Sequence, residues 1–346
     1  MDEEYDCIIL GTGLKECVLS GILSTEGKKV LHIDRNNYYG GESASLNLKQ
    51  IYEKFKISTD NINPEYKNYN IDMVPKFIMS SGLLVKILIK TDVTKYLDFK
   101  SIGASYVYHK GILCKVPSSA KEVTLSNLMG PIQKYKWSSF FDYVLCHDNP
   151  DSKSYNKYDL TKMLTKDLFK KYGLNKDTTT FIGHAVALQH NDDYLDKPAI
   201  EYVKLIKLYG ESMLRFEGSS PYIYPLYGLS EIPQSFARLS AVYGGTYMLN
   251  KNVDEIMYEN GVAVGVKSDG EIAKCKFIIG DPSYFYDNVN NKVNNKVNKT
   301  NKVAKIICIL SQPIKDTNGI ESCQIIIPQN ECNRKNPFRK HNNWIR

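Results

Sequence analysis

The chain has 346 residues, of which 42% are hydrophobic and 24% are charged, and its formal net charge is +7. A chain of this length and composition can bury a substantial core and form two domains, so it is neither a disordered nor a fibrous protein. The lysines are dispersed and often stand beside acidic residues, which is typical of solvated surfaces rather than of a nucleic-acid groove. We therefore expect no nucleic-acid partner.

The eight cysteines are widely spaced, form no CxxC pair and often stand in apolar runs, which predicts buried free thiols in a reducing compartment. The first 30 residues contain no apolar stretch of signal-peptide or membrane-span length. The six histidines are isolated, and no Walker loop or nucleophile elbow is present. We expect a cytoplasmic protein without a metal or a catalytic site, which meets membranes only through a partner.

The chain opens with a strand, a turn, a helix and a second strand. Residues 5–10 are nearly all apolar, residues 14–26 have apolar positions at helical spacing, and residues 28–34, KKVLHID, predict a second strand that ends at Asp34. Glycines fill the turn, and Gly27 follows the helix as a C-cap. This βαβ opening predicts an α/β fold with a parallel sheet.

The turn itself resembles a dinucleotide fingerprint that lacks its third glycine. Gly11 and Gly13 are present, and Asp34 stands 21 residues after Gly13, where a ribose hydroxyl would bind. The third glycine is replaced by Glu16, whose carboxylate can reach back to the amides at the helix start and fill the anion site. The alternative is a surface glutamate that leaves room for a flavin.

Longer amphipathic segments follow and predict a helical domain at 118–218, inserted into a sheet domain made of 1–117 and 219–346. We expect helices at 127–147, 159–172, 178–190 and 199–216, and a further helix at 230–243. Residues 260–261, Asn-Gly, predict a hairpin turn, and 305–314 and 323–329 predict strands. The asparagine and lysine stretch at 288–303 predicts a solvated insertion.

Several long strings resemble the Rab GDP dissociation inhibitor family: MDEEYDCIILGTGLKECVLSG, KKVLHIDRNNYYGGES, VPKFIMSSGLLVKILI, TKYLDFK, SPYIYPLYGLSEIPQSFARLSAVYGGTYMLNK and SCQIIIPQN. The resemblance extends from Met1 to about Lys335. It implies a flavoprotein-like sheet domain that uses no flavin, with an inserted smaller helical domain. Family members continue further, so we expect a C-terminally truncated form whose sheet domain is partly uncovered.

The resemblance also implies a function without catalysis or a cofactor. Members of this family bind GDP-bound, geranylgeranylated Rab GTPases, block GDP release, extract the GTPases from membranes and recycle them in vesicle trafficking. The chain would then be a cytoplasmic monomer that contacts membranes transiently. A Rab escort protein and a flavin-dependent oxidoreductase are the alternatives.

Carried over by matching position, the resemblance implies two groups of site residues. The Rab-binding platform comprises Tyr39, Glu231, Arg238, Thr246 and Met248. The membrane-recycling loop comprises Arg215 and Tyr222. For the platform, the alternative is that Arg238 merely pairs with Glu231 on one helix face.

An isoprenoid pocket is expected between the helices of the inserted domain. Its candidate residues fall at helical spacing and are Phe140, Phe141, Val144, Phe181, Ala185, Leu188, Val203, Ile206 and Met213. The alternative is that these stripes are the core of a helical bundle.

Overall fold

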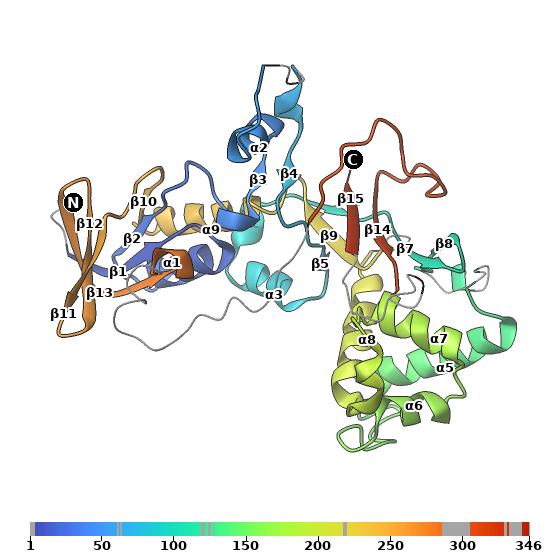
Figure 1. Ribbon diagram of the computed structural model, residues 1–346. Coiled ribbons are helices and arrows are strands. Elements are labelled where there is room, and N and C mark those ends of the chain that lie inside the picture. The colour runs from blue at the N-terminus through green and yellow to red at the C-terminus, as the bar shows by residue number, and fades with distance from the viewer. Residues whose placement is uncertain are drawn as a thin grey trace. The chain divides into compact units, whose positions relative to one another are not determined.

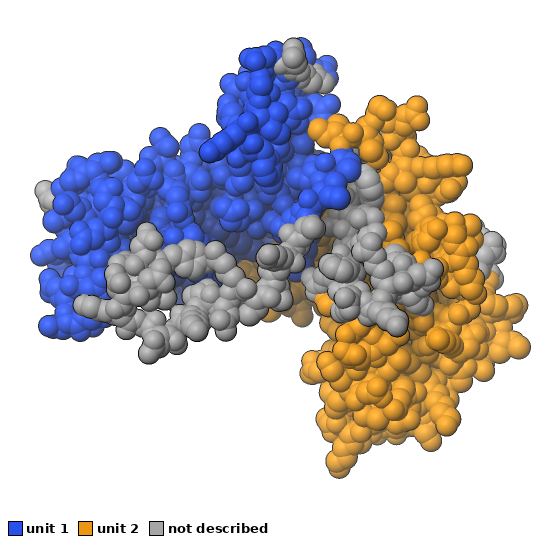
Figure 2. Space-filling view, in the orientation of Figure 1, with its two compact units in different colours: residues 1–76, 88–99, 225–308 blue, residues 77–87, 100–224, 309–346 orange. Residues whose placement is uncertain are grey.

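The computed structural model describes residues 4–60, 62, 64–118, 122–123, 126, 128–216, 220–285, 305–328, 331 and 341–345. The predicted insertion at 288–303 lies outside them. The chain divides into two compact units (Figure 2). Unit 1 comprises residues 1–76, 88–99 and 225–308, and unit 2 comprises residues 77–87, 100–224 and 309–346.

Unit 1 is built on a mixed sheet that contains the predicted βαβ opening. Its strand order is β10 (Thr246–Met248), β2 (Val30–Ile33), β1 (Glu4–Leu10), β13 (Glu271–Gly280), β12 (Val262–Ser268) and β11 (Glu255–Glu259). The first four strands are parallel, and the last two join the sheet antiparallel. The last four residues of β1 are fully buried, because a central parallel strand is covered on both faces. The predicted flavoprotein-like α/β class is confirmed.

Two helices of unit 1, α1 (Leu14–Thr25) and α9 (Glu231–Val242), pack against one another (Figure 1). A Cβ on Gly21 would lie only 3.1 Å from Cδ1 of Phe236, so glycine allows the close approach. The Ser240 hydroxyl exchanges hydrogen bonds with those of Ser20 at 3.0 Å and Ser24 at 2.8 Å. A glycine against an aromatic ring and a cluster of serine hydroxyls therefore lie in this interface.

Hairpins complete the sheet of unit 1. The predicted Asn260-Gly261 turn joins β11 and β12, with φ angles of 51° and 82°. Asp269-Gly270 makes the same kind of turn between β12 and β13, with φ angles of 48° and 82°. The remaining short elements of the unit are η1 (Gly41–Ser43), β3 (Ser45–Leu46), α2 (Leu48–Lys54), η2 (Tyr66–Asn68), β4 (Ile71–Asp72), η3 (Val93–Tyr96) and η6 (Pro282–Tyr284).

Unit 2 combines short sheets with the predicted helices. Its larger sheet has the order β15 (His341–Ile345), β14 (Ser322–Ile326), β7 (Ala104–His109) and β8 (Ile112–Lys115). The short strands β5 (Ile78–Met79), β9 (Tyr222–Pro225) and β6 (Phe99–Ser101) form another sheet at the boundary of the unit. The helices are α5 (Pro131–Cys146), α6 (Thr165–Lys171), α7 (Lys176–Phe181) and α8 (Ala199–Met213), and α3 (Leu83–Lys90) belongs in part to each unit.

Three elements differ from the sequence expectation. The helix expected at 159–172 begins only at Thr165, as α6. The helix expected at 178–190 ends early: α7 passes into a π-helical turn, η4 (Ile182–Val186), and Leu188 has a positive φ of 51°. The strand expected at 305–314 is wrong, because this segment pairs with no strand in the described part of the chain and Ile306 is 87% exposed. An apolar run forms a strand only where a neighbour satisfies its backbone. The strand expected at 323–329 is confirmed as β14.

The two compact units do not coincide with the predicted domain boundaries. Residues 100–117 and 309–346 group with the helices because β7 pairs with both β8 and β14. Val107 of β7 and Ile326 of β14 also belong to the buried cluster that contains the helices. The helical part of unit 2 therefore shares its core with a sheet that the sequence placed in the other domain.

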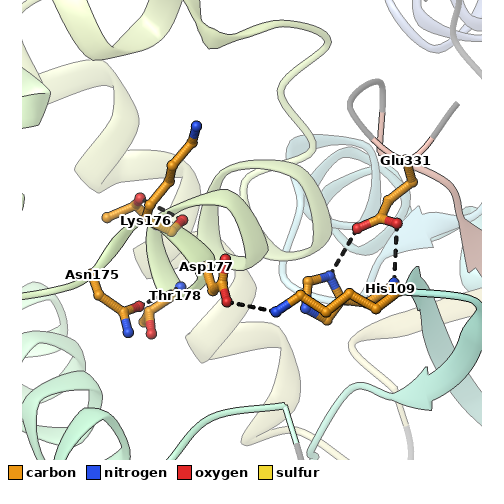
Figure 3. A network of polar contacts seen from close by, with 8 residues as sticks. His109, Asn175, Lys176, Asp177, Thr178 and Glu331 are labelled. Atoms are coloured by element: carbon orange, nitrogen blue, oxygen red, sulfur yellow. Dashed lines mark hydrogen bonds and ion pairs between the residues drawn. The ribbon is translucent and has the colours of Figure 1, made fainter. Parts of the chain in front are cut away.

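A polar network joins the β7–β8 turn to α7 within unit 2 (Figure 3). Glu331 contacts His109 Nδ1 at 2.9 Å and accepts the backbone N–H of Lys110 at 3.0 Å. The Lys110 ammonium donates to Asp177 at 3.0 Å, and this hydrogen bond lowers the pKa of Asp177. Because the Lys110–Asp177 pair is largely exposed, it adds little to stability.

Candidate functional site

The glycine turn of unit 1 is occupied by the protein's own groups. The Asp34 side chain is buried, and its Oδ2 accepts the backbone N–H of Thr12 at 2.7 Å and the Thr12 hydroxyl at 2.5 Å. Its Oδ1 accepts the backbone and side-chain N–H groups of Asn36 at 2.8 and 2.9 Å. The carboxylate that would hold a ribose is therefore engaged internally.

An aromatic ring also covers the turn. Gly11 has a φ of 93°, and a Cβ there would lie 3.3 Å from Cε2 of Tyr284. The Tyr284 hydroxyl accepts the backbone N–H of Arg35 at 3.1 Å, and the Arg35 guanidinium lies over the ring at 4.1 Å from its centroid. Tyr284 thus packs where the glycine turn of this fold class meets a dinucleotide.

Glu16 completes the occupied turn, but not as a helix cap. Its side chain is buried, and its carboxylate lies where a Cβ on Gly13 would have to be placed. The carboxylate thus folds back to the start of α1, as expected, although no hydrogen bond joins it to the amides there among the described residues. With Asp34 engaged, Tyr284 against Gly11 and a carboxylate beside Gly13, these residues do not fit a dinucleotide.

His32 supports the turn from β2. Its Nε2 lies 2.6 Å from the Gly11 carbonyl oxygen, and its ring stacks on Tyr247 with centroids 4.4 Å apart. Burial lowers the pKa of His32 to about 4, because desolvation penalises the charged imidazolium. The neutral ring therefore donates from Nε2 to the turn.

The stability of unit 1 should fall as the pH falls below about 6.5. His32 is the only histidine within the residues of unit 1, and its pKa is lower in the folded than in the unfolded chain. The unfolded chain therefore takes up the proton first, at a cost of about 1.4 kcal/mol per pH unit down to pH ~4. Amide hydrogen exchange of β1 and β2 at pH 7 and pH 5 would measure this loss. His32→Gln should show a smaller loss, and equal losses would contradict a buried neutral His32.

Tyr39 lies beside the start of α9. Its carbonyl oxygen accepts the Ser230 hydroxyl at 3.1 Å, and its ring centroid is 6.3 Å from that of Tyr247 in β10. The ring is half-buried, and this burial raises the pKa of Tyr39. The backbone of Tyr39 is thus fixed while part of its ring remains accessible.

Glu231 and Arg238 both lie on α9 but do not pair with one another. Oε2 of Glu231 accepts the backbone N–H of Tyr227 at 3.0 Å, and burial raises the pKa of Glu231. The exposed Arg238 guanidinium lies over the Tyr96 ring, 4.6 Å from its centroid. The alternative of a simple Arg238–Glu231 ion pair is wrong.

Thr246 and Met248 lie on β10, the edge strand beside β2. Both are half-buried, they share one face of the strand, and Met248 packs against the buried cluster of the sheet. Sequence reasoning missed Tyr96 and Tyr227, which contact Arg238 and Glu231. Their only sequence signal was membership in the strings TKYLDFK and YPLYG.

The two residues expected in the membrane-recycling loop, Arg215 and Tyr222, lie in different kinds of structure. Tyr222 lies in the buried strand β9, only 2% exposed, and not in the expected mobile loop, while its part in membrane recycling stays a prediction. The aromatic and β-branched residues of YIYP, all of them buried, form a strand that pairs with β5. Arg215 is exposed after α8, and its Nη1 donates to the Ser80 carbonyl at 2.5 Å.

The expected pocket residues come together in one hydrophobic cluster of unit 2. The buried members are Phe140, Val144, Phe181, Ala185, Val203 and Ile206, and the partly buried ones are Phe141, Leu188 and Met213. Phe140 meets Phe169 and Tyr172 edge to face, with centroids 5.6 and 5.4 Å apart. The six buried residues therefore act as core, and only the other three offer partly accessible surface.

Comparison with known proteins agrees with this fold. A family model described as GDP dissociation inhibitor matches residues 1–339. Guanosine nucleotide diphosphate dissociation inhibitor 2 of Arabidopsis thaliana is 54% identical over 340 residues, covering 97% of this chain and 74% of that protein. A second Arabidopsis thaliana guanosine nucleotide diphosphate dissociation inhibitor is 56% identical over 339 residues, with the same coverage.

A solved structure shows the same relationship in three dimensions. The crystal structure of a Rab GDI from Plasmodium falciparum matches with a TM-score of 0.82 and 45% identity, covering 97% of this chain and 77% of that one. No helix in the described residues is both long and apolar enough to cross a membrane. The family match over nearly the whole sequence confirms the resemblance, and the chain belongs to the GDP dissociation inhibitor family.

Proposed function

We propose that the chain binds GDP-bound, geranylgeranylated Rab GTPases, slows their release of GDP, extracts them from membranes and recycles them in vesicle trafficking. The chain belongs to the GDP dissociation inhibitor family. Within it, the observation that carries this proposal is the exposed Arg238 of α9, whose guanidinium lies over the Tyr96 ring. Tyr39 supports it, since it lies next to the start of the same helix. The protein would work in the cytoplasm as a monomer that contacts membranes transiently.

The mechanism follows from the conformations of small GTPases. Their switch regions are ordered by the γ-phosphate and loosen after hydrolysis. A platform that fits the loosened form selects the GDP state and holds the switches over the nucleotide. A half-buried tyrosine and a pre-oriented arginine are typical anchors of such an interface, and no covalent bond changes.

Extraction also requires apolar surface for the lipid. At about 0.8 kcal/mol per CH₂, a twenty-carbon isoprenoid resists leaving the bilayer by on the order of 10 kcal/mol. We place its binding site at the margin of the unit 2 cluster, where Phe141, Leu188 and Met213 are partly buried. Entry of the lipid there would require the neighbouring side chains to separate, since the interior of the cluster is packed.

Liposome extraction tests the proposal. The purified chain should move a GDP-loaded, geranylgeranylated Rab GTPase from liposomes into the soluble fraction, whereas the same Rab loaded with a GTP analogue should stay behind. Arg238→Ala should lower the apparent affinity by about tenfold or more, because an oriented arginine anchor is lost. Lys274→Ala, an exposed lysine of β13 in the same unit, is the matched control and should extract normally.

Three results would be informative. Equal extraction by the unaltered chain and the Arg238 variant would remove Arg238 from the platform. Equal extraction of both nucleotide states would contradict selection of the GDP form. Failure of the unaltered chain, with its fold verified by circular dichroism, would reject the proposed function.

A further inference from the structure

We infer that the glycine turn of unit 1, in which a dinucleotide does not fit, holds the Tyr39 loop in place, and that Thr12 and Asp34 are positioning residues for Tyr39. This inference rests on the proposed function of Tyr39 in partner binding. Its physical basis is a continuous set of short contacts from the turn to the loop, all within unit 1.

Thr12 links Asp34 to the loop, because its hydroxyl also lies 3.4 Å from the carbonyl oxygen of Tyr38. Its backbone N–H and its hydroxyl both donate to Oδ2 of Asp34, at 2.7 and 2.5 Å. Its carbonyl oxygen accepts the backbone N–H of Gly40 at 2.9 Å. Thr12 and Asp34 are fully buried, so these bonds are shielded from water, and those to the carboxylate are charge-assisted.

The peptide group between Tyr39 and Gly40 is held at both of its polar atoms. Its own carbonyl accepts the Ser230 hydroxyl at 3.1 Å, and the amide that follows it belongs to Gly40, which Thr12 holds. Gly40 has a φ of 101°, and a Cβ there would lie 2.9 Å from Cα of Ala44. The loop therefore has little freedom at this point, and the Tyr39 ring is presented at a defined place.

Tyr284 contacts the second oxygen of the Asp34 carboxylate. Its hydroxyl lies 3.4 Å from Oδ1 of Asp34, and the backbone N–H of Asp281 in the same segment donates to the carbonyl of Leu10 at 2.9 Å. In nucleotide-binding members of this fold class, the acidic residue and the turn face the ligand. Here the same groups bind protein, so the fold keeps its rigid turn and uses it to fix an interaction loop.

Thr12→Val tests the link because it removes the hydroxyl and keeps the shape and the backbone contacts. Thr12→Ser, which keeps the hydroxyl, is the matched control. Amide hydrogen exchange should rise in a peptide covering residues 36–44 for Thr12→Val and stay near the unaltered level for Thr12→Ser. Unchanged exchange in the valine variant would overturn the inference, whatever the partner proves to be.

A double-mutant cycle with Tyr39→Ala shows whether Thr12 acts through Tyr39. The probe is a GDP-loaded, geranylgeranylated Rab GTPase. Thr12→Val should weaken its binding about tenfold when Tyr39 is present, less than about twofold in the Tyr39→Ala background, and Thr12→Ser should restore it. Equal losses in both backgrounds would show a general structural effect and overturn the positioning role. Absence of Rab binding by the unaltered chain would instead reject the proposed function, with the exchange result still deciding the link.

Discussion

Replacing Phe140 with alanine is expected to lower the free energy of unfolding of unit 2 by about 3–5 kcal/mol. Phe140 lies on α5, is fully buried and packs edge to face against Phe169 and Tyr172. Alanine would remove this contact area and leave a cavity that the surrounding helices cannot fill. Both tryptophans, Trp137 and Trp344, belong to unit 2, so urea unfolding followed by tryptophan fluorescence reports on this unit.

Ile132→Ala on the same helix is the matched control. Ile132 is 71% exposed, so its truncation should change the free energy of unfolding by no more than about 0.5 kcal/mol. The comparison also separates the two interpretations of the Phe140 stripe. A side chain that lines an open lipid pocket would cost little to truncate in the absence of lipid, so similar values for the two variants would contradict its place in the core.

The parts of the fold that sequence predicted are local. The run of buried residues in β1, the glycine turn and the helical spacing of α1 all lie within the first 25 residues, and each has a direct physical signature. The Asn260-Gly261 hairpin is local in the same sense, because both residues adopt positive φ readily. Local patterns of this kind predict local structure independently of the more distant parts of the chain.

The errors arise where a distant segment decides the outcome. The apolar residues at 305–314 predicted a strand, but pattern alone cannot supply the partner that a strand requires. Tyr222 was assigned to a loop by matching a family motif, whereas the aromatic and β-branched residues of its own segment favour the buried strand that forms. Pairing of β14 with β7 joins segments about two hundred residues apart, which moved the boundary between the two units.

In the candidate site, too, the local features were predictable from the sequence and the long-range contacts were not. The sequence indicated the glycine turn, Asp34 and the unusual Glu16, and these residues do lie together. It could not indicate that Tyr284 would cover Gly11, because 273 positions separate them in the chain. Nor could it pair Arg238 with Tyr96, since a cation over an aromatic ring leaves no spacing rule in sequence.

Replacing Gly40 with alanine should destabilise unit 1 far more than replacing Gly27 with alanine. Both glycines have positive φ, 101° and 77°, so both variants incur the strain of a left-handed conformation, about 1–2 kcal/mol. A Cβ on Gly27 meets nothing within 4 Å, whereas one on Gly40 would lie 2.7 Å from the Ser230 hydroxyl and 2.9 Å from Cα of Ala44. The Ala44 contact is with backbone, so it cannot be relieved by a rotamer change.

We therefore expect a loss of about 1–2 kcal/mol for Gly27→Ala, from strain alone, and of about 2–5 kcal/mol for Gly40→Ala, the sum of strain and overpacking. Amide hydrogen exchange of β1 and β2 measures both losses within unit 1. Gly40→Ala should also weaken Rab binding, because relief of the contact moves the loop that carries Tyr39, whereas Gly27→Ala should bind normally. Equal losses of stability would mean that the loop shifts freely, and a freely shifting loop could not hold Tyr39 for a partner.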